Sequence, residues 1–334
     1  MDRVKVRKLS SLALRFNSPR KTYNFLHATY EGRTHKIVVK SHPVRAQMDP
    51  SSVCNLRCPE CYYGQRHPEK RRSGMMKFED FKAYFDPVAP YLLSIALYNW
   101  GESFLNDDFP RMAEYANSRN VCTVVHSNMN ILTPAKAEAA VKSGLFHIYL
   151  SIDGACQETY QKYRIGGDFE RVIDNIRLMV ETKRRLRSAT PILTWKLLTF
   201  PHVPPEEVGQ ARRMAMEIGC DNFLVSLPNP VSTGRHPLPE GSLKRPKLCR
   251  YLYGELYVDW DGSVMPCCLA FRDSEVFGNL RDSDWQTVWN NERFREARAM
   301  FANPFAELPA GSLPCTECPI LLNWREWNRR MRQT

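Results

Sequence analysis

Two spacings of apolar residues alternate along this chain. Short apolar runs typical of buried strands are separated by longer segments in which apolar residues recur at helical spacing. The clearest helical segment begins at Phe169, and Val172, Ile176 and Met179 fall on one of its faces. The pattern predicts strands at 36–40, 45–51, 94–98, 121–126, 147–152, 192–200 and 222–227, and helices at 78–86, 109–118, 134–143, 169–182 and 208–218.

Strands that alternate with helices at this rhythm predict parallel βα units and an α/β fold. About six such units are present, fewer than a closed barrel needs, so we expect a partial (β/α)6 TIM-like barrel. An open, doubly wound sheet fits the same alternation. Further along, Asp261-Gly262 is a strong turn signal, which predicts a β-hairpin of strands 255–260 and 263–266, followed by a helix at 285–301.

A stretch rich in proline, glycine and basic residues divides the chain, as expected of a linker. The expected organisation is a basic N-terminal extension, the barrel, this linker, a small C-terminal module of hairpin plus helix, and a basic C-terminal tail. The corresponding ranges are 1–44, 45–230, 231–248, 249–320 and 321–334.

Positive charge is concentrated at the ends of the chain, whose formal net charge is +11. Residues 1–50 hold eleven Lys or Arg against three acids, and the last ten residues hold four Arg against one acid. The basic ends are either solvated termini or, through the segment 4–30, a surface for an anionic partner or a membrane. No recognition motif for nucleic acid is present.

The chain shows no export or membrane signal. No uncharged apolar run is long enough for a transmembrane helix. The N-terminus is charged from Asp2 and Arg3 onward and has no uninterrupted apolar core, so no secretory signal is expected. Eleven cysteines in such a chain argue against disulfides and for metal or redox chemistry in a reducing compartment. We therefore expect a cytoplasmic protein.

Three cysteines lie close together just after the strand at 45–51. Cys54, Cys58 and Cys61 have the spacing C-x3-C-x2-C. A structural zinc ion requires four ligands, and the nearest further candidate is His67. An iron–sulfur cluster held by three cysteines instead leaves one iron open for a substrate or cofactor.

This spacing at the start of an α/β chain resembles the radical S-adenosylmethionine (SAM) superfamily. The resemblance implies a [4Fe–4S] cluster whose open iron binds SAM, and reductive cleavage of SAM to a 5′-deoxyadenosyl radical that abstracts hydrogen. One residue departs from the family pattern, because Glu60 stands where relatives have an aromatic residue. Tyr62 and Tyr63 follow the motif directly.

The resemblance also implies SAM-binding residues after the predicted strands. Gly101 and Glu102 match the family's glycine–glutamate motif, whose carboxylate receives the SAM ammonium group. Ser127 and Asn128 match part of a Thr-Asn-Gly motif, with Met129 in place of the glycine. The alternative interpretation of Glu102 is an exposed acid in a βα turn.

A third motif, Ser-Ile-Asp-Gly, follows the strand at 147–152. The resemblance implies that Ser151 and Asp153 offer polar groups to the ribose, and that Arg164 pairs with the methionyl carboxylate. Alternatively, Asp153 caps a turn and Arg164 pairs with Asp168 or Glu170.

The C-terminal module holds a second group of cysteines, Cys249, Cys267, Cys315 and Cys318. Paired cysteines also occur in zinc ribbons. The spacing C-x12-G-x4-C with a later C-x2-C resembles the twitch module, a shortened SPASM domain, which implies a second, auxiliary [4Fe–4S] cluster. Cys268 is expected to be a spare cysteine, and the alternative is that it takes the place of Cys267. The remaining cysteines, Cys122, Cys156 and Cys220, are expected to pack as small apolar side chains.

A fully ligated auxiliary cluster implies an electron acceptor, and therefore a net oxidation (dehydrogenation) of a sugar-like or aminocyclitol molecule. Epimerisation or modification of a peptide or protein side chain is the alternative, and an electron-relay protein without SAM chemistry is a further one. Lys196, Tyr98 and His126 are the candidate proton-handling residues. The first 44 residues are short for a peptide-recognition domain, which favours a small molecule. Flavodoxin or ferredoxin is the expected reductant.

Overall fold

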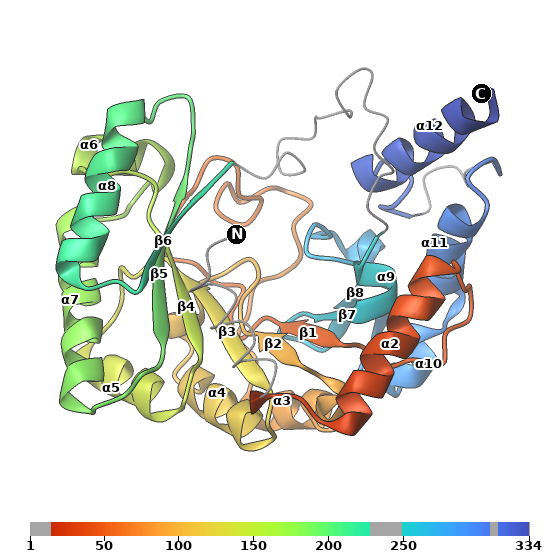
Figure 1. Ribbon diagram of the computed structural model, residues 1–334, viewed down its shortest axis with the longest axis horizontal. Helices are drawn as coiled ribbons and strands as arrows, with labels where there is room; N and C mark the ends of the chain where they lie inside the picture. Colours follow the sequence, from red (N-terminus) through yellow and green to blue (C-terminus); the bar gives the residue numbers. More distant parts are fainter. Residues whose placement is uncertain (1–14, 228–248, 308–312, 334) are drawn as a thin grey trace.

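The computed structural model describes residues 15–227, 249–307 and 313–333. Six parallel strands stand side by side in their order along the chain and curve into an open half-barrel (Figure 1). They are β1 (Arg45–Met48), β2 (Ser94–Ala96), β3 (Cys122–Ser127), β4 (His147–Ser151), β5 (Ile192–Leu198) and β6 (Asn222–Ser226). The predicted partial TIM-like barrel is confirmed.

Helices cover the outer face of this sheet (Figure 1). They are α3 (Phe78–Phe85), α4 (Phe109–Ser118), α5 (Pro134–Lys142), α6 (Gln157–Tyr163), α7 (Phe169–Arg185) and α8 (Pro205–Ile218), with 3-10 turns η1 (Ala89–Tyr91) and η2 (Ser103–Leu105). Outward-facing strand residues such as Ile95, Val125 and Ile148 are fully buried against the helices. Because strand side chains alternate, the residues between them face the interior of the half-barrel.

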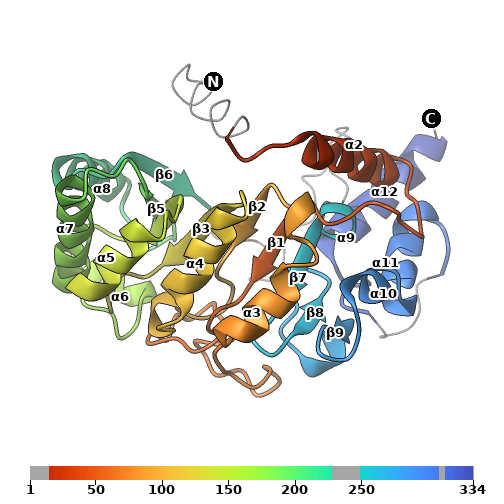
Figure 2. The same ribbon diagram turned by 90° about the horizontal axis from the view of Figure 1, so that it is seen from below.

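The C-terminal module extends the same sheet. Its first strand, β7 (Glu255–Val258), pairs with β1 in parallel, with Glu255 opposite Arg45. The predicted hairpin then adds β8 (Ser263–Met265), followed by β9 (Gly278–Asn279), both antiparallel to their neighbours (Figure 2). Gly262 occupies the turn with a φ of 84°, a conformation that glycine adopts readily. The sheet therefore has nine strands in the order β6-β5-β4-β3-β2-β1-β7-β8-β9.

Helices surround the C-terminal strands on the side away from β6. They are α2 (Pro19–Arg33), α9 (Tyr251–Gly254), α10 (Trp285–Trp289), α11 (Glu292–Ala302) and α12 (Pro319–Gln333), with the 3-10 turn η3 (Asp273–Glu275). The single helix expected at 285–301 is wrong: it divides in two because the Asn291 side chain accepts the Phe294 N–H and caps α11. Most of the predicted basic tail forms α12.

The strand expected at 36–40 is also wrong. Side chains, and not a neighbouring strand, satisfy its backbone. The carboxylate of Glu31 accepts the Lys40 and Ser41 N–H groups at 2.7 and 3.0 Å, and Asn290 binds both backbone groups of Val39 at 3.0 Å. The apolar run therefore lies as a loop between α2 and α10.

The predicted linker, 231–248, lies outside the described residues. None of the described helices has both the length and the apolar composition needed to cross a membrane.

Candidate active site

The loop that carries the first three cysteines is fixed against the end of β2. The Glu102 N–H donates to the Val53 carbonyl at 2.9 Å. A Cβ atom at Gly101 would lie 1.9 Å from the Ser51 carbonyl oxygen, so only glycine allows the two segments to approach so closely. A Cβ atom at Gly64 would likewise lie 2.8 Å from the Cys58 nitrogen.

Nitrogen donors point at all three sulfur atoms of this loop. Cys54 Sγ accepts from the Leu56 N–H at 3.5 Å, and Cys61 Sγ accepts from the Gly64 N–H at 3.4 Å. Cys58 Sγ accepts from Arg164 Nη1 at 3.7 Å. Burial raises the pKa of the Cys54 thiol to about 12. Because hydrogen bonds to sulfur are characteristic of iron–sulfur ligation, this donor set fits a cluster.

Glu102 is buried at the end of β2, so the alternative of an exposed acid is wrong. Its carboxylate accepts from the Asn128 N–H at 2.7 Å and from the Ser127 hydroxyl at 2.9 Å. Burial raises its pKa, and these hydrogen bonds oppose the rise. The structure thus brings Glu102, Ser127 and Asn128 together, and Asn128 Nδ2 also lies 3.9 Å from Cys54 Sγ.

Arg164 pairs with Asp153, not with Asp168 or Glu170. Its Nε and Nη2 atoms lie 2.7 and 2.6 Å from Asp153 Oδ2. The second oxygen of Asp153 accepts the Leu198 N–H at 2.8 Å, so both carboxylate oxygens already have partners. Asp153 therefore fixes the orientation of the Arg164 guanidinium group. Ser151 is the last residue of β4 and lies in register with Lys196 of β5.

The second group of cysteines lines a cavity of about 350 Å³ in the C-terminal module. Its walls include Cys249, Cys267, Cys315 and Cys318. Burial raises the pKa of the Cys249, Cys267 and Cys318 thiols, and backbone N–H groups two or three residues further along oppose the rise. Among the described residues, no three His, Cys, Asp or Glu side chains are arranged to hold a single metal ion. Four cysteine side chains that line one cavity match the full ligation of a [4Fe–4S] cluster.

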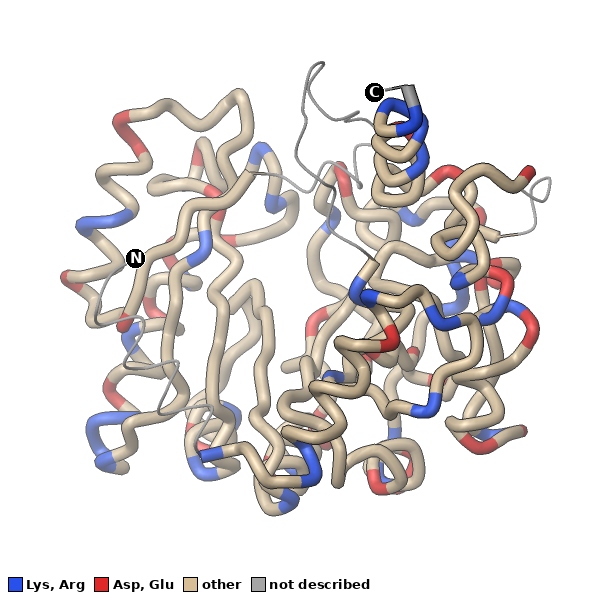
Figure 3. Tube along the Cα trace, turned by 45° about the vertical axis from the view of Figure 1, so that its right-hand side comes forward, with Lys and Arg blue, Asp and Glu red and all other residues tan. Residues whose placement is uncertain are grey.

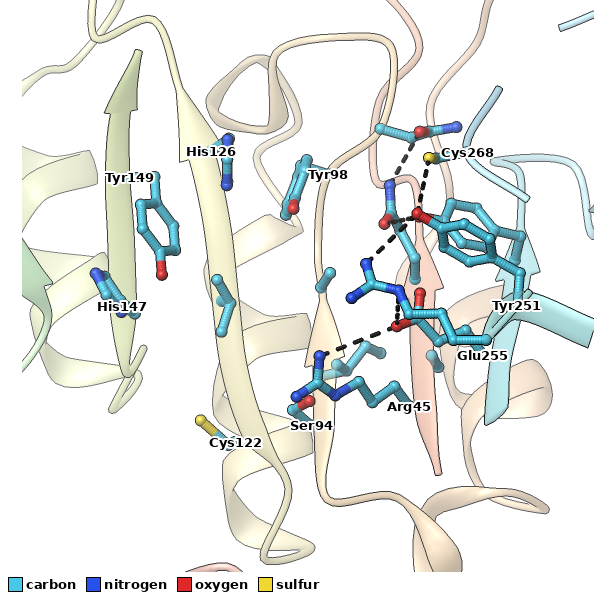
Figure 4. A pocket seen from close by; sticks show the side chains of 18 of the residues that line it. Arg45, Ser94, Tyr98, Cys122, His126, His147, Tyr149, Tyr251, Glu255 and Cys268 are labelled. Atoms are coloured by element: carbon cyan, nitrogen blue, oxygen red, sulfur yellow. Dashed lines mark hydrogen bonds and ion pairs between the residues drawn. The ribbon is translucent and has the colours of Figure 1, made fainter. Parts of the chain in front are cut away.

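The structure separates the adjacent Cys267 and Cys268. Cys267 lines the cavity of the second cysteine group, and burial, followed by the charges of Cys268 and Cys315, raises its pKa well above the usual value. Cys268 instead lines the barrel cavity, where its thiol lies 3.7 Å from the Tyr251 hydroxyl (Figure 4).

This difference predicts opposite outcomes for two neighbouring substitutions. Cys267→Ala is expected to remove the auxiliary iron, about four atoms per chain, whereas Cys268→Ala is expected to retain it. Iron and acid-labile sulfide analysis of the anaerobically reconstituted variants measures both. Loss of iron from Cys268→Ala alone would reverse the assignment.

The two tyrosines after Cys61 stack on aromatic rings of different parts of the fold, one in the C-terminal module and one in the barrel. The ring of Tyr62 stacks on Phe271 with centroids 3.8 Å apart, and the ring of Tyr63 stacks on Trp100 at 5.5 Å. Tyr62 and Phe271 both line the cavity of the second cysteine group. The sequence indicated two aromatic residues here, but their partners are more than 35 residues away and carry no local signal.

A cavity of about 800 Å³ occupies the interior of the half-barrel. Its wall on β2, β3 and β4 is a row of rings, Tyr98, His126, Tyr149 and His147, each stacked or tilted against the next (Figure 4). Because each ring covers its neighbour's face, the row presents hydroxyl and imidazole edges to the cavity. Burial lowers the pKa of His126 well below its usual value, so it is neutral near pH 7.

Positive charges lie at both ends of this cavity. Arg45 and Arg250 flank Glu255 at 3.9 and 3.3 Å near the start of β1 (Figure 4). Lys196 lies on β5 near the strand ends, and burial lowers its pKa. The candidate proton-handling residues Lys196, Tyr98 and His126 therefore share one cavity.

The other three cysteines have different environments. Cys220 is buried, as predicted. Cys122 lines the barrel cavity, and Cys156 is exposed at the start of α6, so neither packs as a core side chain.

Two buried carboxyl groups, Asp49 and Asp259, lie next to each other at the ends of β1 and β7. Burial, followed by the charge of Asp259, raises the pKa of Asp49 well above its usual value. Burial raises the pKa of Asp259 to about 6, and Arg71 opposes the rise. Above the usual carboxyl pKa, the unfolded chain has lost the protons of Asp49 and Asp259, whereas the folded state still binds protons on this pair.

Because the folded state binds more protons in this range, stability is expected to fall as pH rises from about 5 to 8. Asp49→Asn removes one of the two charges. We expect it to raise the free energy of unfolding at pH 8 by at least about 1 kcal/mol and to flatten this dependence. Urea unfolding at the two pH values measures both effects, and an unchanged slope would contradict the prediction.

A half-barrel whose strand ends converge on a three-cysteine loop, joined to a module with four further cysteines, defines a SAM-dependent iron–sulfur enzyme. The comparisons agree. Residues 48–214 match the radical SAM superfamily, and residues 249–319 match SPASM, an iron–sulfur cluster-binding domain. The chain belongs to the radical SAM superfamily. Its cofactors are SAM and a [4Fe–4S] cluster, with auxiliary iron–sulfur binding in the SPASM domain.

Individual relatives are distant. The Fe-coproporphyrin III synthase of Methanosarcina barkeri is 29% identical over 33% of this chain and 27% of that protein. The AdoMet-dependent heme synthase of the same organism is 25% identical over 59% of this chain and 54% of that protein. The chain therefore matches about a quarter of the first relative's length and about half of the second's. Streptococcus suis SuiB bound to precursor peptide SuiA shares the fold, with a TM-score of 0.63, 15% identity, and coverage of 91% of this chain and 76% of SuiB.

Proposed function

We propose that this chain oxidises a small, hydroxylated and negatively charged molecule by SAM-dependent radical chemistry. The observation that carries the proposal is the barrel cavity, whose volume suits a small ligand. The Tyr hydroxyl groups and His imidazoles along its wall can form hydrogen bonds. Its charged lining consists of three basic residues, Arg45, Arg250 and Lys196, and one acid, Glu255. A sugar acid or sugar phosphate has the matching hydroxyl groups and charge.

The proposed cofactor contacts use the residues at the strand ends. Cys54, Cys58 and Cys61 would hold the first cluster, and Cys249, Cys267, Cys315 and Cys318 the auxiliary one. Gly101, Glu102, Ser127, Asn128, Ser151 and Arg164 would bind SAM, and Asp153 would position Arg164. When bound, these groups supply one-electron chemistry that removes a hydrogen atom from the substrate, with flavodoxin or ferredoxin as electron source.

Lys196 is the proposed proton acceptor. Oxidation of an alcohol carbon to a carbonyl removes a hydrogen atom, a proton and one further electron. The auxiliary cluster would accept the electron, and Lys196 Nζ would receive the hydroxyl proton. No described residue accepts a hydrogen bond from this ammonium group, and burial lowers its pKa, which increases the neutral fraction available as a base. The charges of Asp153 and Arg164 act on Lys196, which supports its position near the SAM-binding end of the cavity.

The experiment that tests the function is a screen of reconstituted protein for substrate-dependent 5′-deoxyadenosine release. Uronic acids and sugar phosphates are expected to stimulate release more than the matching neutral sugars, and the product is expected to lack two hydrogens. A product of unchanged mass and inverted configuration would indicate epimerisation instead. Stimulation by neutral sugars alone would contradict the proposed charge preference.

Lys196→Met tests the proton acceptor. Loss of the base is expected to lower product formation at least about 100-fold while SAM binding persists. Wild-type turnover is expected to rise with pH as Nζ loses its proton, and this limb should disappear in the variant. Tyr149→Phe, which removes a hydroxyl group from the same cavity, is the control. Equal losses in both variants, or an unchanged pH profile, would exclude the role.

A peptide substrate is the second candidate. SuiB, which shares the fold, has been solved with a precursor peptide bound. In this chain the described part of the first 44 residues provides the helix α2 and no recognition domain. Stimulation of 5′-deoxyadenosine release by peptides and not by sugar acids would favour this candidate.

A further inference from the structure

Helix α2 has three polar residues on its buried face and three large apolar residues on its exposed face. Lys21, Asn24 and Glu31 are each at most 4% exposed. Each is held by backbone groups: Lys21 Nζ donates to the Phe16 carbonyl, Asn24 binds both backbone groups of His42, and Glu31 accepts from Lys40 and Ser41. The inner face therefore anchors the helix through hydrogen bonds.

The outer face carries Tyr23, Leu26 and Tyr30, which are 71%, 60% and 57% exposed. These positions follow the helical spacing of i, i+3 and i+7, so they form one stripe. Val38, in the loop after the helix, is 57% exposed. A stripe of this kind on an otherwise well-packed protein indicates that something covers it.

The charges around the stripe identify the covering surface. Arg20, Arg33 and Lys36 are exposed at the two ends of the helix and just beyond it. Between residues 15 and 44 the sequence holds one acid, Glu31, and its carboxylate is buried. Figure 3 shows further basic positions on α12, and His35 contacts Trp324 of that helix with ring centroids 5.1 Å apart. The stripe is thus framed by positive charge.

We propose that α2 lies in the interface of an anionic membrane, with Tyr23, Leu26 and Tyr30 among the lipid headgroups. An apolar stripe bordered by Lys and Arg is the composition of helices that lie in the membrane plane. Basic side chains next to the bilayer attract anionic lipids. An anionic bilayer repels exposed acids, which explains why residues 15–44 carry none. A protein partner or a second copy of the chain would tolerate acids there.

The test is sedimentation of the reconstituted full chain with vesicles. Vesicles of phosphatidylcholine with about a third phosphatidylglycerol are expected to bind at least about tenfold more protein than phosphatidylcholine alone. Raising the salt concentration should weaken this binding because it screens the charges. The triple variant Tyr23→Ser, Leu26→Ser and Tyr30→Ser should lose at least about tenfold of the binding.

A matched pair of single variants separates this surface from general surface hydrophobicity. Leu26→Ser is expected to weaken vesicle binding, whereas Met216→Ser, 47% exposed on α8, is not. Iron content and thermal unfolding midpoint verify that each variant is folded. Absence of wild-type binding, or equal binding by the triple variant, would overturn the proposal. Concentration-dependent self-association lost in the triple variant, without vesicle binding, would assign the stripe to a second copy instead.

Discussion

Replacing Cys54, Cys58 and Cys61 together by alanine is expected to lower the iron content from about eight to about four atoms per chain. The variant should also release no 5′-deoxyadenosine, because no open iron remains to bind SAM. The remaining iron belongs to the cavity of the other four cysteines, which the substitutions do not touch. Iron and sulfide analysis, EPR of the reduced protein and a SAM cleavage assay measure these changes.

The reciprocal variant, Cys315→Ala with Cys318→Ala, is the control. It is expected to lose the other four or so irons while retaining SAM cleavage without substrate. If the triple variant kept all its iron, the three-cysteine loop would not be a cluster site. If wild-type protein held iron but cleaved no SAM, an electron-relay protein would become the better interpretation.

Replacing Arg71 by methionine is expected to destabilise the fold by about 3–5 kcal/mol, because it leaves buried carboxylates without a counter-charge. Arg71 is buried, and its guanidinium lies 2.7 Å from both Asp259 and Asp261. A third contact, to Asp273 at 2.9 Å, involves a mostly exposed carboxylate and contributes little. The midpoint of urea unfolding at fixed pH measures the loss.

Arg177→Met provides a matched control for this prediction. Arg177 pairs with Asp174 at 2.9 Å, and both side chains are exposed, so the expected loss is below about 1 kcal/mol. Similar losses in the two variants would show that Arg71 contributes no more than a surface ion pair. Arg71 comes from the loop before α3 and its partners from the hairpin, so the larger loss would identify it as a clamp between barrel and module.

The chemistry-bearing loops were predictable because their signals are local. The spacing of Cys54, Cys58 and Cys61 places three thiols on one loop in any fold, and Gly101 and Glu102 follow a strand whose apolar run is visible in sequence. Strands and helices of the barrel were identified for the same reason, since apolar periodicity follows from backbone geometry. Errors arose where a distant side chain replaced a local partner, as Asn290 does at 36–40.

The sequence by itself therefore determined the α/β class, the cysteine loop and the second cysteine group, and it left a partial barrel and an open sheet as alternatives. Only the tertiary structure decided that β7 extends the barrel sheet, that Cys267 and Cys268 face different cavities, and that Arg164 pairs with Asp153. It alone revealed that helix α2 buries polar side chains and exposes large apolar ones. Each of these depends on which groups meet in the folded chain. Which polar group finds which partner is set by the packing of the whole chain, while periodicity and spacing record only local geometry.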